Sequence, residues 1–163
     1  MDFNNNYQEI DLNYCRASSG KRFANYIIDT IVFYIVAFGL GVVIGFLNPG
    51  LLVEVDDLSL RLVLLLFYGI VMFMTEAMSN GTSIGKLITG TRAVNNDGSD
   101  MSFQKAFVRN IVRAIPFNAL SALGTPSTPW HDRWSDTMVI DEKKMALQTQ
   151  RVDLFDSVKN QIQ

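Results

Sequence analysis

Residues 30–47 form a run of 18 residues without a single charge, TIVFYIVAFGLGVVIGFL. Extended back to Phe23, the run predicts a helix at about 23–47, and at ~1.5 Å per residue such a helix crosses a hydrocarbon core of ~30 Å. A second apolar run, Leu62–Thr75, lengthens at both ends into a helix at about 58–78. A chain with two such runs is predicted to be an integral membrane protein.

A soluble hairpin buried in a globular domain is the alternative for these two runs. It is disfavoured because a chain of 163 residues leaves little sequence to cover them. The 14 Lys and Arg against 16 Asp and Glu lack the basic excess of a nucleic-acid binder. One cysteine and one histidine exclude an internal disulfide and make a transition-metal site improbable, so we expect no metal and no cofactor.

Most basic residues lie outside the predicted hairpin, and Arg61 is the one basic residue between its two apolar runs. Since basic loops stay in the cytoplasm, both ends of the hairpin are predicted to face it. The polar segment 1–16 lacks the features of a signal peptide and is predicted to be a cytoplasmic N-terminus. Segment 17–141 is the predicted membrane domain, and 142–163 a cytoplasmic tail, either a short helix or a flexible end. The flanking basic residues are Arg16, Lys21 and Arg22 before the hairpin, and Lys86, Arg92, Lys105, Arg109 and Arg113 after it.

The segment after the second helix combines strand and helix patterns. Ile88–Val94 and Thr137–Ile140 are predicted strands, which must lie on one side of the membrane if they pair. Between them, a third helix at about 102–123 is amphipathic and basic, as in helices that lie in the interface or re-enter the membrane. A third full span is the alternative, although Pro116 and Asn118 interrupt it. The predicted fold is therefore an all-α membrane protein with two transmembrane helices, an interfacial or re-entrant third helix and a small cytoplasmic β element.

Two acidic residues of the predicted membrane helices are the main candidates for function. Arg22 and Asp29 are seven positions apart on one helix face, ~10 Å along the axis, and a charge at that depth needs a partner. Asp29 is either an ion- or proton-binding carboxylate or a polar contact that pins the helices. Glu76 ends the second helix at a similar depth and could join Arg109 and Arg113 in an ion-binding or polar cluster, or simply be solvated at the boundary.

Three further patterns have structural interpretations. Ala37, Gly41 and Gly45 are small residues at the spacing of close helix packing, within one chain or in a dimer. Residues 81–86, GTSIGK, are one residue short of a phosphate loop and are followed by leucine, so they predict a tight turn with its lysine at the headgroups. No catalytic residues are predicted around His131, since no nucleophile motif accompanies it, and we expect no enzyme. Trp130 and Trp134 fit an interfacial belt.

Four segments together resemble the RDD family of bacterial membrane proteins: Ala17–Asp29, Gly81–Val94, Arg109–Arg113 and His131–Ile140. The resemblance implies that the arginine and first aspartate of the family name are Arg22 and Asp29. It leaves the second aspartate open between Asp132 and Asp136. It also implies a two-span membrane domain, often suspected of taking part in transport, with no recognised catalytic residues.

These observations favour a bacterial inner-membrane protein that takes part in transport of an ion or small solute, with cation/proton exchange as one form. Two helices alone can hardly enclose a pathway, so transport requires a homo-oligomer or a membrane partner protein within the lipid bilayer. In that mechanism Asp29, with Glu76, binds the ion, Arg22 sets its pKa, and Asp132 closes the cytoplasmic side. The alternative is a structural or accessory protein whose Arg and Asp residues only fasten the helices.

Overall fold

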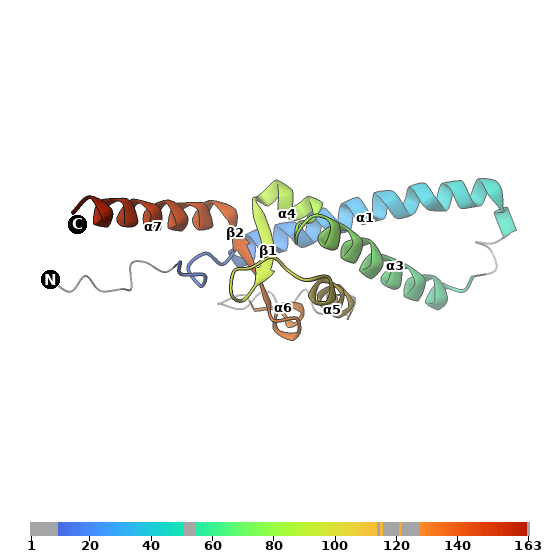
Figure 1. Ribbon diagram of the computed structural model, residues 1–163. Coiled ribbons are helices and arrows are strands. Elements are labelled where there is room, and N and C mark those ends of the chain that lie inside the picture. The colour runs from blue at the N-terminus through green and yellow to red at the C-terminus, as the bar shows by residue number, and fades with distance from the viewer. Residues whose placement is uncertain (1–9, 51–54, 114, 116–120, 122–127, 163) are drawn as a thin grey trace.

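A computed structural model describes residues 10–50, 55–113, 115, 121 and 128–162. Figure 1 shows a long helical hairpin, α1 and α3, and a last helix, α7, that projects the other way. Between them lies a small group of short helices and strands, α4, β1, α5, α6 and β2, which we call the mixed body. The elements are α1 (Ser19–Leu47), α3 (Asp57–Met78), α4 (Ile84–Thr89), β1 (Thr91–Asn95), α5 (Phe103–Arg113), α6 (Trp130–Trp134), β2 (Thr137–Asp141) and α7 (Glu142–Ile162).

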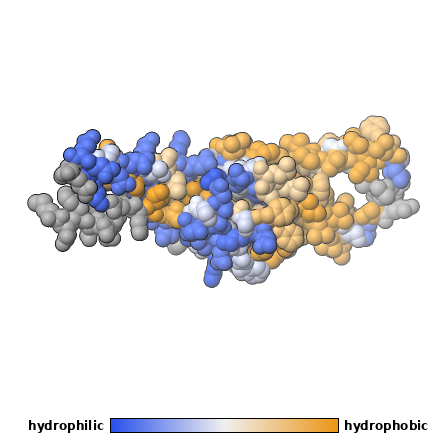
Figure 2. Space-filling view, viewed as in Figure 1, coloured by the Kyte–Doolittle hydropathy of each residue, from blue (hydrophilic) through white to orange (hydrophobic). Residues whose placement is uncertain are grey.

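Within the described part of the chain, α1 and α3 are the two helices long and apolar enough to cross a membrane. Only 6% of the most apolar window of each is buried, so neither is the core helix of a globular domain. Figure 2 shows the consequence: the hairpin forms a hydrophobic half of the molecule, and polar residues gather at the other half. α1 begins at Ser19, earlier than the predicted Phe23, because the Ser18 hydroxyl accepts a hydrogen bond from the Lys21 N–H and caps the helix.

The two long helices touch through aromatic side chains. Phe33 of α1 packs against Phe67 and Tyr68 of α3, with ring centroids 5.6 and 5.2 Å apart. Beyond this contact toward the loop, a Cβ built on Gly41 would meet no atom within 4 Å. Gly41 therefore does not serve close packing against α3 within one chain.

The first residues of the predicted strand Ile88–Val94 are helical instead. Ser83 caps α4 by accepting from the Lys86 N–H, and Gly90 ends it with a left-handed backbone, φ 64°. The cap and the glycine stop outweigh the β-branched residues that suggested a strand. β1 then pairs antiparallel with β2, Thr91 opposite Asp141, and buries a small apolar core of Cys15, Val94, Met138 and Ile140.

The predicted third helix is described only over its first half, as α5. Residues 114, 116–120 and 122–127 lie outside the described residues, and with them most of the segment that was predicted to re-enter or cross. Phe103 and Phe107 of α5 pack edge-on against Phe73 of α3, with centroids 4.7 and 5.4 Å apart. The C-terminal tail is helical as α7, which begins directly after β2.

Candidate functional site

Six charged side chains meet where the hairpin joins the mixed body, and we call them the ionic cluster. They come from five helices that are distant in sequence, α1, α3, α4, α5 and α6. Three of them, Glu76, Lys86 and Arg109, are 0% exposed. Charges removed from water are stable only with close partners of opposite sign. The cluster consists of Arg22, Glu76, Lys86, Arg109, Arg113 and Asp132.

Asp132 holds one half of the cluster together. Its two carboxylate oxygens form ion pairs with Arg22 and with Arg109, one oxygen to each guanidinium. The same arginines also donate to β2, Arg22 to the Val139 carbonyl at 3.3 Å and Arg109 to the Thr137 hydroxyl at 2.8 Å. Burial alone would raise the pKa of Asp132, but Arg109 and Arg22 outweigh it and hold that pKa far below its usual value. Asp132 is therefore a permanent negative charge between two arginines.

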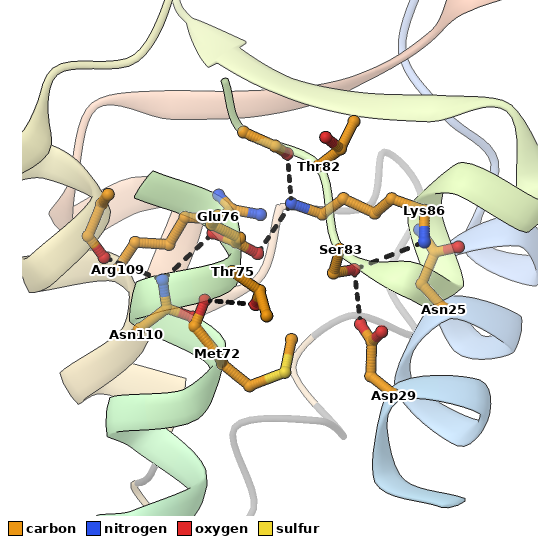
Figure 3. A network of polar contacts seen from close by, with 12 residues as sticks. Asn25, Asp29, Met72, Thr75, Glu76, Thr82, Ser83, Lys86, Arg109 and Asn110 are labelled. Atoms are coloured by element: carbon orange, nitrogen blue, oxygen red, sulfur yellow. Dashed lines mark hydrogen bonds and ion pairs between the residues drawn. The ribbon is translucent and has the colours of Figure 1, made fainter. Parts of the chain in front are cut away.

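Glu76 holds the other half, at the end of α3 (Figure 3). One carboxylate oxygen lies 2.7 Å from Lys86 Nζ and 2.7 Å from an Arg113 guanidinium nitrogen. The other lies 3.2 Å from Arg109 Nε and accepts from the Asn110 amide at 3.1 Å. Because Arg109 contacts both carboxylates, the ion pairs run without a break from α1 to α4.

Lys86 was predicted to reach the lipid headgroups, but the structure buries its side chain completely inside the protein. Its Nζ donates to Glu76 and, at 2.9 Å, to the Gly81 carbonyl. The turn at Gly81, with φ 87°, lets the chain fold back so that α4 points this lysine inward. Burial lowers the pKa of Lys86 to about 7, Arg109 and Arg113 add to the effect, and Glu76 opposes it. Burial therefore disfavours the charged form of Lys86, and the ion pair with Glu76 favours it.

Asp29 lies outside the cluster and fastens α1 to α4. One of its oxygens accepts from the Ser83 hydroxyl and the other from the Gly85 N–H, both at 2.7 Å (Figure 3). Gly85 allows this approach, since a Cβ there would lie 2.5 Å from the Asn25 carbonyl oxygen. One turn earlier on the same face, Asn25 contacts the hydroxyl of Thr91.

The structure joins Asp132, not Asp136, to Arg22. Asp136 is exposed, has a positive φ of 49° and offers its backbone oxygen to the Asn96 N–H. His131, next to Asp132, lies with Nε2 3.4 Å from that carboxylate. Burial lowers the pKa of His131 well below its usual value, so its imidazole is neutral at pH 7.

Sequence reasoning named Glu76 with Arg109 and Arg113 as a possible polar cluster, and the structure brings these three together. It also named Arg22, Asp29 and Asp132, but it did not find the partners of Asp29 or the role of Lys86. Ser83, Gly85 and Lys86 all come from the GTSIGK segment, which was interpreted as a turn only. The signal was available: a Ser, a Gly and a Lys follow within ten residues of Glu76, the charge at the end of the second predicted membrane helix. The partners Asn110 and Thr137 carried no signal in a single sequence.

The charges of the ionic cluster are unevenly balanced. Four basic side chains surround two carboxylates, while the carboxylate of Asp29 is engaged elsewhere. In the described residues no group of three or more His, Cys, Asp or Glu is placed to hold a metal ion.

Comparison with known proteins assigns the chain by sequence. The model of the RDD family matches residues 16–147, which include α1, the whole ionic cluster and Asp29. No curated protein and no solved structure matches the chain.

Proposed function

The chain belongs to the RDD family of membrane proteins, and on that premise we propose that its charged residues fasten a helical hairpin that serves as a structural or accessory unit in the membrane. The observation that carries this proposal is that two buried carboxylates each bridge separate elements of the fold. Both oxygens of Asp29 and both oxygens of Asp132 are occupied by donors from other elements. Each carboxylate therefore links elements that are distant in the sequence, as a fastening role requires.

The role that we propose is not enzymatic. The hairpin would sit in the bacterial inner membrane with both ends in the cytoplasm, supported by the basic residues that flank it on both sides. Its helices leave most of their apolar surface open, which suits association with a second copy or with a membrane partner protein. Reporter fusions at the loop near residue 52 and after residue 163 test the orientation, since only the loop fusion should be active in the periplasm.

Substitutions at Asp29 test the fastening role. Asp29→Asn keeps an acceptor for one donor and gives up the charge, so it should lower the melting temperature in detergent. Asp29→Glu should also be poorly tolerated, because its longer side chain displaces Ser83 or Gly85. Normal stability of both variants would contradict the proposal.

Transport of an ion or small solute is the second candidate function, and Lys86 favours it. Its buried ammonium group, with a pKa of about 7 and two arginines nearby, can load and release a proton under physiological conditions. In this form Lys86 carries the proton and Glu76 is its counter-charge, and a homo-oligomer provides the pathway. An excess of basic groups favours coupling to an anionic solute over the exchange of a cation at Asp29.

Proton movement into liposomes distinguishes the two candidates. Purified wild-type protein is compared with Lys86→Met and Asp29→Asn, each first shown to be folded, under imposed gradients of cations and of anions. Flux in wild type and Asp29→Asn but not in Lys86→Met supports transport through the cluster. Flux that Asp29→Asn abolishes in a folded protein restores the ion-exchange mechanism at Asp29. No flux under any gradient leaves the fastening role.

A further inference from the structure

The two short helices α4 and α5 have their polar and apolar faces reversed relative to a soluble protein. α4 buries Gly85 and Lys86 and exposes Leu87 and Ile88, which are 75% and 66% accessible. A helix on the surface of a water-soluble domain buries its apolar stripe and exposes its charges. The face that α4 exposes is therefore apolar, unlike that of a helix at a water-facing surface.

α5 shares this feature in part, because it buries Arg109 and Asn110 together with the apolar Ala106 and Val112. Arg109 and Asn110 face inward, while Phe103 and Ile111 are 65% and 51% exposed. α4 packs on α1 at Asn25 and Asp29, and α5 packs on α3 at Phe73. The two helices thus lie over different parts of the ionic cluster, with their apolar side chains directed away from it.

The length of α3 sets the depth of this arrangement. Its 22 residues measure ~33 Å, close to the ~30 Å of a hydrocarbon core, so Met78 lies near the boundary of the core. Phe73, on which α5 rests, is ~7.5 Å deeper by the same rise per residue. The outer face of α5 is therefore continuous with the lipid-facing surface of α3.

We propose that α4 and α5 are seated in the bilayer, so that their outer faces contact acyl chains of one leaflet and the ionic cluster lies below the headgroups. The occupant of this surface is lipid, as continuity with α3 requires. Trp130 and Trp134 of α6, 41% and 62% exposed, are at the adjoining edge, and tryptophan is enriched at the level of the headgroups. The basic groups that would normally be drawn to the headgroups, Lys86 and Arg109, point inward because their counter-charges are inside.

Fluorescence quenching by brominated lipids tests the proposal in the full-length protein. A single cysteine is introduced as Leu87→Cys or Ile111→Cys in a Cys15→Ala background, labelled with a small fluorophore and reconstituted into vesicles. Leu66→Cys on α3, where the side chain is 65% exposed, is the lipid-facing control, and Asn96→Cys in the exposed turn after β1 is the aqueous control. Lipids brominated along the acyl chain should quench positions 87 and 111 as strongly as position 66, and position 96 hardly at all.

The second measurement is the rate at which the introduced cysteines react with a water-soluble maleimide, which distinguishes contact with water from contact with lipid or protein. Slow reaction at positions 87 and 111, together with quenching, supports the proposal. Fast reaction without quenching shows that these faces meet water and overturns it. Slow reaction without quenching means that protein covers them, which also overturns it, as does quenching at only one of the two positions. None of these outcomes depends on whether the protein transports anything.

Discussion

Arg22 and Asp132, 110 positions apart in the sequence, form a buried ion pair between α1 and α6. The pair joins the start of the first membrane helix to the segment just before β2, and Arg109 of α5 binds the other oxygen of the same carboxylate. Asp132 thereby connects the membrane helix α1 to both α5 and α6 of the mixed body. The residue that the resemblance matches to the family's arginine thus meets one of the two candidates for its second aspartate.

Removal of the Asp132 charge should be strongly destabilising. Asp132→Asn leaves Arg22 and Arg109 buried with no full counter-charge, and breaking a buried pair in this way costs ~3–5 kcal/mol. Thermal unfolding in detergent measures the loss. The matched control is Asp136→Asn, which changes an exposed carboxylate four residues away and should alter stability by less than ~0.5 kcal/mol. Equal effects of the two substitutions would refute the assignment of Asp132.

Glu76 and Lys86 should differ in their effect although they form one pair. Glu76→Gln removes the carboxylate that Lys86, Arg109 and Arg113 share, and two of these three are fully buried, so a loss of ~3–5 kcal/mol is expected. Lys86→Met removes one of three cations and lets Glu76 keep Arg109 and Arg113, so its loss should be smaller. Urea or thermal unfolding of both variants checks the order, and the reverse order would contradict the shared role of Glu76.

Addition of a methyl group at Gly85 should separate α1 from α4. A Cβ at this position would lie 2.5 Å from a backbone oxygen that cannot move aside without bending α1. Gly85→Ala should therefore lower the melting temperature and weaken the contacts of Asp29. Gly39→Ala, where a Cβ meets nothing within 4 Å, is the control and should be neutral or slightly stabilising because alanine favours helix. A stable Gly85→Ala protein would show that the close approach is not needed.

Acid should weaken the mixed body through His131. Its pKa in the folded protein is far below the 6.5 of an unfolded histidine. Below about pH 6.5 His131 is therefore protonated in the unfolded chain but stays neutral in the folded one. The free energy of unfolding then falls by up to ~1.4 kcal/mol for each pH unit of acidification. Asp132, with its pKa below 3.8, adds its own loss only at pH values under about 4. Unfolding from pH 7.5 to 5 should show this slope in wild type and a flatter one in His131→Gln, and identical slopes would exclude His131 as the cause.

The two long helices follow from the sequence because their determinants are local. Apolar length alone marks α1 and α3, and the depth of Asp29 and Glu76 follows by counting residues from the ends of the runs. α4 shows the limit of local patterns. Its β-branched residues suggested a strand, whereas the Ser83 cap, the Gly90 stop and the inward pull of Glu76 on Lys86 make it a helix.

The sequence by itself therefore determined that the chain is a membrane hairpin of the RDD type and which charges lie too deep to be left alone. Only the tertiary structure decided the partner of each charge: Ser83 and Gly85 for Asp29, three basic groups for Glu76, two arginines for Asp132. The physical reason is that the cost of a buried charge depends on depth, which counting along the chain can estimate. That cost is offset by partner atoms within ~3 Å, which come from segments far apart in the sequence. Only the folded arrangement determines which atoms come that close.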